Sequence, residues 1–487
     1  MILLVILIPI VSGALISLVP FKKRGHMELF LEMMVIINSF LVWYLLLHRP
    51  ADNFTLVNFT GNLSVSFKVD GMSMVFAGLV STLWPLATLY AFEYMTKEEH
   101  EKIFFTFYTM TYGVTLGISL ASNLLTMYFF YELLTLITVP LVMHTLTREA
   151  ILASRKYLYY SLGGAAFAFI GLIFIITYGN TTDFVLGGVL DLEKIGGRTN
   201  VLLLIYVIAF MGFGVKAAVC PFNSWLPDAG VAPTPVTALL HAVAVVKSGA
   251  FAAIRLTYYS FGTEFLRGTW AQDLLMIIVM FTIVYGCSRA VKETHIKRRL
   301  AYSTISNLSY ILFGVTIMTP LGMMGALTHL VFHAVMKISS FFCAGAIMHQ
   351  TGKHYVHELD GIGYKMPCVF GVFTVSSLAL MGVPGMAGFV SKWYLASAAV
   401  ESGNGIAYAG IGCLLISALL TAIYMFTIVI RAFFPVKGYD ASVLEGIKDP
   451  NWKMLVPLLI FTGNMIMFGL WSGPVLKFLS DVAAGVY

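Results

Sequence analysis

The sequence has few charged residues for its length. Of its 487 residues, 11% are charged and 59% are hydrophobic, whereas soluble proteins have about 25% charged and roughly 45–50% apolar residues. A soluble protein of this size would lack the charges needed to cover its surface, so the composition excludes a cytosolic enzyme and indicates a membrane protein. Runs of about five or six like charges, typical of arms that bind nucleic acid, are also missing, and nucleic acid is not an expected partner.

Cysteine is scarce as well, and no two cysteines form a CxxC pair. The five residues are scattered through apolar stretches: Cys220, Cys287, Cys343, Cys368 and Cys413. This pattern disfavours an iron–sulfur cluster, a structural zinc site and a disulfide framework. We therefore expect buried thiols in a chain that carries no electrons and has no metal, cofactor or catalytic site of its own.

Long apolar runs are what the sequence has instead. Runs of about 18 residues or more are candidate transmembrane helices. The first run has no basic region before it and no small-residue cleavage site, which favours a retained span over a signal peptide. Fourteen runs are separated by polar turns: 2–20, 29–48, 71–92, 103–121, 123–145, 156–178, 199–219, 235–258, 270–290, 300–318, 321–348, 366–398, 405–431 and 453–473.

The basic residues between the runs predict an orientation. Connections after odd-numbered runs carry 19 Lys and Arg, among them Lys297 and Lys437, and the other connections with the C-terminal tail carry 7, among them Arg255. Because cytoplasmic loops are enriched in Lys and Arg, we expect both termini outside, in the cell membrane of a prokaryote. Alternation around Gly61-Asn62 in residues 51–70 predicts a small external β-hairpin.

Five ionisable residues inside the runs are the most informative feature. An ionised side chain at the bilayer centre costs about 2.5–3.5 kcal/mol. A single lysine could snorkel to the interface and a single carboxylate could be a packing group, but five together indicate pairing, neutralisation or a hydrated internal path. With one carboxylate against four lysines, we expect at least one or two lysines to be uncharged at rest. The five are Glu132, Lys216, Lys247, Lys337 and Lys392.

Two of these lysines lie beside helix-breaking residues. Two glycines and Pro221 surround Lys216, and Gly382-Val383-Pro384-Gly385 precedes Lys392. Transporters build ion sites where a helix breaks at mid-membrane, so both segments are predicted to be broken helices. We expect Glu132 to be the charge partner of a buried lysine.

The spacing of the two broken helices predicts the organisation of the chain. They lie five helices apart, and an odd number of helices inverts the second copy of a repeat in the membrane. The predicted fold class is an all-α membrane protein of about 14 transmembrane helices. It would divide into helices 1–3 with the hairpin, a first five-helix repeat, a second, inverted repeat and a last helix: residues 1–102, 103–258, 270–431 and 453–473.

Histidines accompany the lysines. His329, His333 and Lys337 recur every four residues and share one helix face. His241 lies six residues before Lys247, about 240° away on a regular helix, so these two point to different faces unless that helix is distorted. Two histidines could hold metal or haem, but without an accompanying carboxylate or cysteine a metal is not expected. A hydrated proton relay agrees better with side chains that titrate.

These motifs resemble the antiporter-like subunits shared by respiratory complex I, membrane-bound hydrogenase-type complexes and Mrp-type multisubunit cation/proton antiporters. The resemblance covers nearly the whole chain, and Glu132, Lys216 and Lys392 with their neighbours belong to it. The other matching segments are Val69-Asp70-Gly71-Met72-Ser73, Pro221-Phe222-Asn223-Ser224-Trp225-Leu226-Pro227-Asp228-Ala229, Ala232-Pro233-Thr234-Pro235-Val236, His241 with Lys247, Arg298-Arg299-Leu300-Ala301-Tyr302-Ser303-Thr304-Ile305-Ser306, and His329/His333/Lys337.

The resemblance implies roles for the ionisable residues. Glu132 and Lys216 would form an interacting pair at the first broken helix, and Lys392 would exchange protons at the second. Protons would move between them along a central group: His241, Lys247, His329, His333 and Lys337. The chain looks most like the D-type member of the Mrp antiporter subunits, so its partners would be other membrane subunits of an Mrp-like or complex I-like assembly.

Sodium is a less suitable cargo for this chain than the proton. Na⁺ prefers hard oxygen ligands, and buried lysines repel it, so any sodium path is expected in a partner subunit or at an interface. Two other classes stay open. One is a stand-alone secondary cation/proton antiporter. The other is a membrane redox enzyme such as a haem–copper oxidase, which needs more helix-borne histidines than the chain offers. Whether the assembly itself is redox-driven does not follow from these residues.

Overall fold

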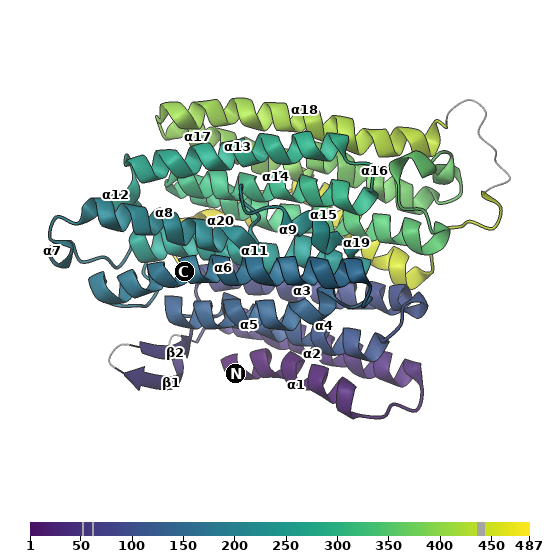
Figure 1. The fold of residues 1–487 in the computed structure, drawn as a ribbon, viewed down its shortest axis with the longest axis horizontal. Coiled ribbons are helices and arrows are strands. Elements are labelled where there is room, and N and C mark those ends of the chain that lie inside the picture. Colours follow the sequence, from purple (N-terminus) through teal and green to yellow (C-terminus); the bar gives the residue numbers. More distant parts are fainter. Residues whose placement is uncertain (51–52, 61–62, 436–443) are drawn as a thin grey trace.

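Nearly parallel helices make up most of the molecule (Figure 1). The computed structural model describes residues 1–50, 53–60, 63–435 and 444–487. The helices run along the long axis of the bundle, and a two-stranded hairpin projects from one end. Both chain termini lie in the half of the bundle nearer the hairpin.

Twelve of the predicted runs correspond to single α-helices. The bounds are α1 Ile2–Leu18, α2 Arg24–His48, α3 Gly71–Tyr94, α4 Glu101–Ser119, α5 Leu124–Val142, α6 Arg148–Tyr178, α8 Thr199–Lys216, α13 Trp270–Lys292, α14 Ile296–Ile317, α15 Pro320–Thr351, α18 Gly405–Phe433 and α19 Trp452–Leu470.

The other two predicted runs are divided. Run 366–398 forms α16 (Pro367–Met381) and α17 (Ala387–Glu401). Run 235–258 contains two π-helical segments, and its parts are α10 Thr234–Ala238, η3 Leu239–Val243, α11 Val245–Ile254 and η4 Arg255–Phe261. Additional short helices lie between the runs or after them: α7 Leu192–Ile195, α9 Trp225–Asp228, α12 Thr263–Leu266 and α20 Gly473–Ala483, with 3₁₀ turns η1 Met95–Lys97, η2 Ala229–Val231, η5 Val356–Glu358 and η6 Ile362–Tyr364.

The helices have the length and composition of membrane spans. Within the described residues, 11 helical segments are long and apolar enough to cross a bilayer. Helices α1 and α16 are apolar but shorter, with 17 and 15 residues. The chain is therefore a mostly helical, multi-pass membrane protein, while the count of fourteen spans and the sidedness of the termini stay predictions.

The predicted hairpin is present at the end of the bundle. Strand β1 (Phe54–Thr60) pairs antiparallel with β2 (Leu63–Phe67). Its turn, Gly61-Asn62, lies outside the described residues, as does Lys437. Ser66 of β2 fixes the hairpin to the start of α5, because its backbone N–H donates to the hydroxyl of Thr126 at 3.0 Å.

Polar side chains determine where several helices begin. Asn123 accepts a hydrogen bond from the backbone N–H of Thr126 at the start of α5, and Thr319 accepts one from Gly322 at the start of α15. The first N–H groups of a helix have no partner within the helix, and side-chain oxygens of this kind satisfy them. These caps fix the ends of two helices that carry predicted site residues.

An internal ion pair joins α3 to η4. Asp70 caps α3, and its two carboxylate oxygens accept hydrogen bonds from the Nη1 and Nη2 atoms of Arg255, both at 2.7 Å. The Arg255 side chain is 0% exposed and its guanidinium lies near the rings of Phe184, Phe251 and Tyr259. Burial raises the pKa of Asp70, but the charge and hydrogen bonds of Arg255 outweigh it and hold that pKa well below its usual value.

Two basic residues are therefore not where the sequence analysis put them. Arg255 is buried in the bundle, not in a connection. Lys297 is also buried, and its ammonium donates to the carbonyl of Ala232 at 2.8 Å. The apolar runs end close to both residues, which is why their sequence context is that of a loop. The predicted excess of basic residues on one side persists without them.

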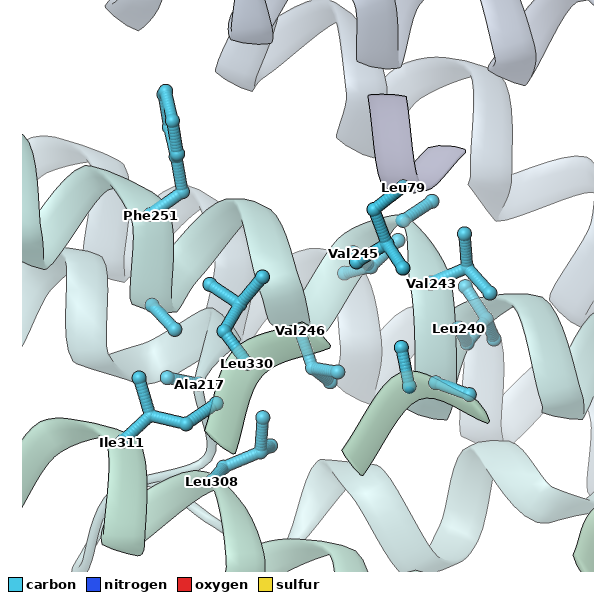
Figure 2. Close-up of a cluster of buried hydrophobic side chains, with 14 of the residues drawn as sticks. Leu79, Ala217, Leu240, Val243, Val245, Val246, Phe251, Leu308, Ile311 and Leu330 are labelled. Atoms are coloured by element: carbon cyan, nitrogen blue, oxygen red, sulfur yellow. The ribbon is translucent and has the colours of Figure 1, made fainter. Parts of the chain in front are cut away.

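The centre of the bundle consists of the segment from α10 to η4 together with α14 and α15. Nearly all residues of these spans are buried, whereas fewer than half of the residues in the apolar parts of α2, α6, α18 and α19 are buried. Figure 2 shows apolar side chains that fill the space between the central helices, including Leu79, Leu240, Val245, Val246, Leu308, Ile311 and Leu330. Any charge on the central helices therefore lies in surroundings of low polarity.

Candidate functional site

All eight predicted site residues lie in helical segments. Glu132 belongs to α5, and the other seven belong to segments between α8 and α17. Lys216 is the last residue of α8, His241 lies in η3, Lys247 in α11 and Lys392 in α17. Helix α15 carries three of them: His329, His333 and Lys337. Six of the eight are buried, and Glu132 and Lys392 are half-buried.

Lys216 lies at the end of an interrupted helix. After α8 ends at this residue the chain leaves the helical conformation, with Ala218 at φ 55°, before α9 begins at Trp225. The Lys216 ammonium donates to the backbone carbonyl of Tyr131 and lies 3.3 Å from the centre of the Tyr131 ring. A carbonyl and an aromatic face therefore stabilise this cation inside the bundle.

Glu132 directly follows Tyr131, the residue whose carbonyl binds the Lys216 ammonium. Within the described residues Glu132 makes no ion pair with Lys216, and its Oε1 atom has no hydrogen-bond partner. The carboxylate lines an apolar groove of about 310 Å³ with Tyr128, Phe129 and Phe169. Lys216 binds the carbonyl of the preceding residue, Tyr131, and a direct Glu132–Lys216 pair stays a prediction.

A direct contact connects α11 to α15. The Lys247 Nζ atom lies 2.5 Å from Nδ1 of His333. The His333 and His329 rings stack with centroids 5.5 Å apart, and Nδ1 of His329 lies 2.9 Å from the hydroxyl oxygen of Ser391. Ser391 precedes Lys392 in α17. We call Lys247, His333, His329, Ser391 and Lys392 the polar axis.

Lys392 ends the polar axis at the second interrupted helix. Its ammonium donates to the carbonyls of Leu380 and Met381, at 2.7 and 2.9 Å. Helix α16 ends at Met381, so these carbonyls belong to its last turn and lack partners within the helix. The negative end of the α16 dipole thus faces the Lys392 cation.

Gly382 makes this arrangement possible. It follows α16 with φ 92°, and an added Cβ atom would lie 3.1 Å from Cδ of Lys392. We expect Gly382→Ala to destabilise the protein by about 1–3 kcal/mol, because alanine is strained at positive φ. The measurement is the thermal unfolding temperature of the purified protein. Gly371→Ala, inside α16 and with open space around its Cα, is the control; equal temperatures for the two variants would contradict the expectation.

Lys337 and His241 lie beside the polar axis. The Lys337 ammonium donates to the Ser303 hydroxyl at 2.7 Å and to the Leu300 carbonyl at 3.1 Å. Both ring nitrogens of His241 lack a partner among the described residues, and the ring packs 4.9 Å from that of Phe341 in α15. His241 and Lys247 both contact α15, because the π-helical turn of η3 changes their angular spacing from that of a regular helix.

The sequence contains no pattern that predicts the hydroxyl partners of these cations. Ser303 occurs only as one letter of a matched motif, and Ser391 and Tyr131 only as neighbours of Lys392 and Glu132. Serine and tyrosine are common in transmembrane helices, so no pattern in the sequence distinguishes the residues that bind a lysine. The partners of Lys337 are 34 and 37 residues away in the chain, and only the packing of α14 on α15 brings them together.

Comparison with known proteins identifies relatives along most of the chain. A family model described as "NADH:quinone oxidoreductase/Mrp antiporter, TM" matches residues 121–421, and one described as "NADH-Ubiquinone oxidoreductase (complex I), chain 5 N-terminus" matches residues 57–105. NADH-quinone oxidoreductase subunit N of Desulforudis audaxviator is 28% identical over 85% of this chain and 83% of its own. A Na(+)/H(+) antiporter subunit of Alkalihalophilus pseudofirmus is 30% identical over 84% of this chain and 53% of its own.

Solved structures share the fold. A chain of the Mrp complex from Dietzia sp. superposes with a TM-score of 0.85 at 20% identity, covering 100% of this chain and 97% of that chain. A chain of an archaeal respiratory membrane complex, the membrane-bound sulfane sulfur reductase, gives 0.84 at 20% identity and covers 99% of this chain and 97% of that chain. Since the first family model spans more than half of the residues, the protein belongs to the NADH:quinone oxidoreductase/Mrp antiporter transmembrane family.

Proposed function

We propose that this chain is a proton-translocating antiporter-like subunit of a multisubunit membrane complex, either an Mrp-type Na⁺/H⁺ antiporter or the Mrp-like module of a hydrogenase-like or complex I-like assembly. The observation that carries the proposal is the polar axis. Lys247, His333, His329 and Ser391 follow one another at contact or stacking distance, and Lys392 is the next residue after Ser391 in α17. Such a series lets a proton pass between groups that each accept and release one.

Each site residue has a role in this proposal. Lys216, near Glu132, is the coupling cation at the first interrupted helix, and opening or closing of that pair shifts the charge on Lys247. Protons then move through the histidines to Lys392, the terminal exchange residue. His241 and Lys337 flank this route: His241 has two free ring nitrogens among the described residues, and Lys337 lies one helical turn from His333.

The internal repeats are part of the proposal. Fourteen transmembrane helices would contain two inverted repeats, residues 103–258 and 270–431, preceded by residues 1–102 and followed by 453–473. The positions of two lysines support this division, because each lies where a helix of the fourth span of a repeat ends: α8 ends at Lys216, and Lys392 contacts the last turn of α16. Both termini would lie outside, as the distribution of Lys and Arg predicts.

A polar cavity suggests how protons reach the interior. It has a volume of about 230 Å³ and lies where α9 and η2 meet the start of α14. Its lining includes Glu149, Asp228, His295 and the buried Lys297. The pKa of His295 is lowered to about 4, chiefly by burial, so this imidazole is neutral near pH 7. We assign this cavity to the cytoplasmic side, in line with the predicted orientation.

Partner subunits are the second part of the proposal. The relatives are named as subunits of an oxidoreductase and of an antiporter, which favours an assembly over the stand-alone antiporter. Mass spectrometry of the complex that co-purifies in mild detergent tests this. Partners with cysteine-rich iron–sulfur sequences would indicate a redox-driven complex, and small multi-span partners alone would indicate a gradient-driven one. A chain that purifies and transports without partners would contradict the proposal.

Sodium is assigned to a partner subunit or to an interface. Within the described part of the chain, none of the lysines Lys216, Lys247, Lys337 and Lys392 has a carboxylate in ion-pair contact. Na⁺ needs hard oxygen ligands without competing cations. A sodium ion bound among these lysines in a high-resolution map would overturn this assignment.

Replacing Lys247 tests proton transport along the polar axis directly. We expect Lys247→Ala to lower proton transport at least about tenfold, because His333 loses its cationic contact in the series. The complex is reconstituted in liposomes, and internal pH is followed with a trapped dye after an ion gradient is applied. Lys477→Ala, on an exposed side chain of α20, is the control. Wild-type transport by Lys247→Ala would refute a route through this residue.

A further inference from the structure

A second buried polar group lies between α13, α14 and α18, beside the polar axis. It consists of hydroxyl and thiol side chains with no formal charge. All of them are buried: Cys287, Ser303, Ser306, Tyr310, Ser417, Thr421 and Tyr424. Two lysines contact this group: Lys337 donates to Ser303, and the Lys392 ammonium lies 5.3 Å from the centre of the Tyr310 ring.

The hydroxyl of Tyr424 has two acceptors but one proton. It lies 2.6 Å from the Ser303 hydroxyl oxygen and 3.1 Å from that of Thr421. The Thr421 hydroxyl donates to the backbone carbonyl of Ser417 at 2.7 Å. Because a phenol can donate only one hydrogen bond at a time, the bonds at Tyr424 can run in either of two directions.

The first direction suits a charged Lys337. The ammonium donates to Ser303, Tyr424 donates to Thr421, and Thr421 donates to a carbonyl. The Ser303 proton then turns toward Tyr424, which is the reverse of the donation from Tyr424 to Ser303 that the structure shows. Every dipole in this series points its negative end toward the cation, and hydrogen bonds in series strengthen one another. The arrangement stabilises an ammonium that has no carboxylate contact among the described residues.

The second direction suits a neutral Lys337. Tyr424 turns its proton to Ser303, and Ser303 donates to the free electron pair of Nζ. No covalent bond changes in the hydroxyl groups: only the proton on Nζ arrives or leaves, and the O–H bonds rotate. Neither protonation state leaves the buried Ser303 or Tyr424 hydroxyl unsatisfied, which would cost about 1–3 kcal/mol.

We infer that Ser303 and Tyr424 form a reversible hydroxyl switch that holds Lys337 in place in both its charged and its neutral form. This inference rests on the proposed function, in which lysines near the axis change charge. Ser303 and Tyr424 are positioning residues, since they act through Lys337. The other titratable groups that face Lys337 are His333 on its own helix, His241 in η3, Lys247 in α11 and Cys287 in α13.

Transport of the reconstituted complex as a function of pH tests the switch. Ser303→Ala removes the hydroxyl acceptor of the ammonium and should move the alkaline limb of the pH profile down by about one unit, since hydrogen bonds to charged groups have that size. Tyr424→Phe should move it in the same direction. Ser303→Thr keeps a hydroxyl and should restore the wild-type profile. Tyr90→Phe removes a buried phenol that binds the Phe342 carbonyl instead, and should leave the profile unchanged.

A spectroscopic measurement separates failure of the switch from failure of the proposed function. Infrared difference spectra of tyrosine-labelled complex, recorded between pH 6 and pH 9, should contain a phenol band that is lost in Tyr424→Phe and in Lys337→Met but kept in Tyr90→Phe. This band does not depend on transport. Its absence from the wild type, or an equal shift of the transport profile in Tyr90→Phe, would overturn the switch, whereas wild-type complex that moves no protons would overturn the proposed function alone.

Discussion

Lys216→Ala is expected to abolish coupled proton transport while the complex still assembles. The Lys216 ammonium lies at the break after α8, against the carbonyl and ring of Tyr131. Removing it leaves Glu132 without its nearby cation and, in the proposed mechanism, removes the charge that shifts Lys247. Assembly should survive, because a neutral side chain at this depth avoids the cost of a buried charge, about 2.5–3.5 kcal/mol.

The measurement is dye-reported proton flux in liposomes, together with size-exclusion chromatography of the complex. Lys365→Ala removes an exposed lysine and should behave as wild type in both assays. Loss of flux with a normal elution volume is the expected result. Undiminished flux in Lys216→Ala would show that protons do not depend on this residue, and loss of the complex from the column would assign the lysine a role in folding.

Asp70→Ala is expected to destabilise the protein by about 3–5 kcal/mol, which is the usual effect of leaving one member of a buried ion pair unpaired. The Arg255 guanidinium is 0% exposed and donates to both oxygens of Asp70. Lys68, whose ammonium lies 3.5 Å from the same carboxylate, loses its partner too. The measurement is the thermal unfolding temperature of the purified complex, with Asp191→Ala as the control at a helix cap that binds no buried arginine among the described residues.

Two further results would distinguish charge from packing. The double variant Asp70→Ala/Arg255→Leu should recover part of the loss, since no unpaired charge remains. Because the pKa of Asp70 lies below its unfolded value, its contribution is fully present above that unfolded value, about pH 4, and is lost only as pH falls further. The stability difference between wild type and Asp70→Ala should therefore be constant from pH 5 to pH 8. A variant as stable as the wild type would mean that Arg255 finds another partner.

The sequence predicted the helices well because the bilayer constrains them strongly. A backbone in hydrocarbon must satisfy its hydrogen bonds internally, so a long apolar run has few alternatives to a helix. The helix ends near Lys216 and Lys392 were predictable for a related reason. Glycine and proline beside a buried charge indicate that the helix stops inside the membrane, where its free backbone groups can bind the charge. The π-helical turns at His241 and Arg255 were not, because an extra residue in a turn has no compositional mark.

The site was predictable to the extent that its residues carry charge. Lysines and histidines stand out in apolar runs, whereas the groups that bind them do not. Ser303 and Tyr424 belong to α14 and α18, 121 residues apart in the chain, and their proximity depends on how three helices pack. Arg255 was misplaced for the same reason: its partner, Asp70, lies 185 residues earlier, and the local sequence resembles a connection.

The contact between Lys392 and the end of α16 limits how many exchangeable protons this end of the polar axis can hold. A carboxylate that neutralises a lysine can itself take up a proton, and the two groups then compete for it. The carbonyls of Leu380 and Met381 have no such capacity. The partial charges of these carbonyls are the same at every pH. The contact between Lys392 and the end of α16 therefore holds either one exchangeable proton or none, depending on the Lys392 amine alone.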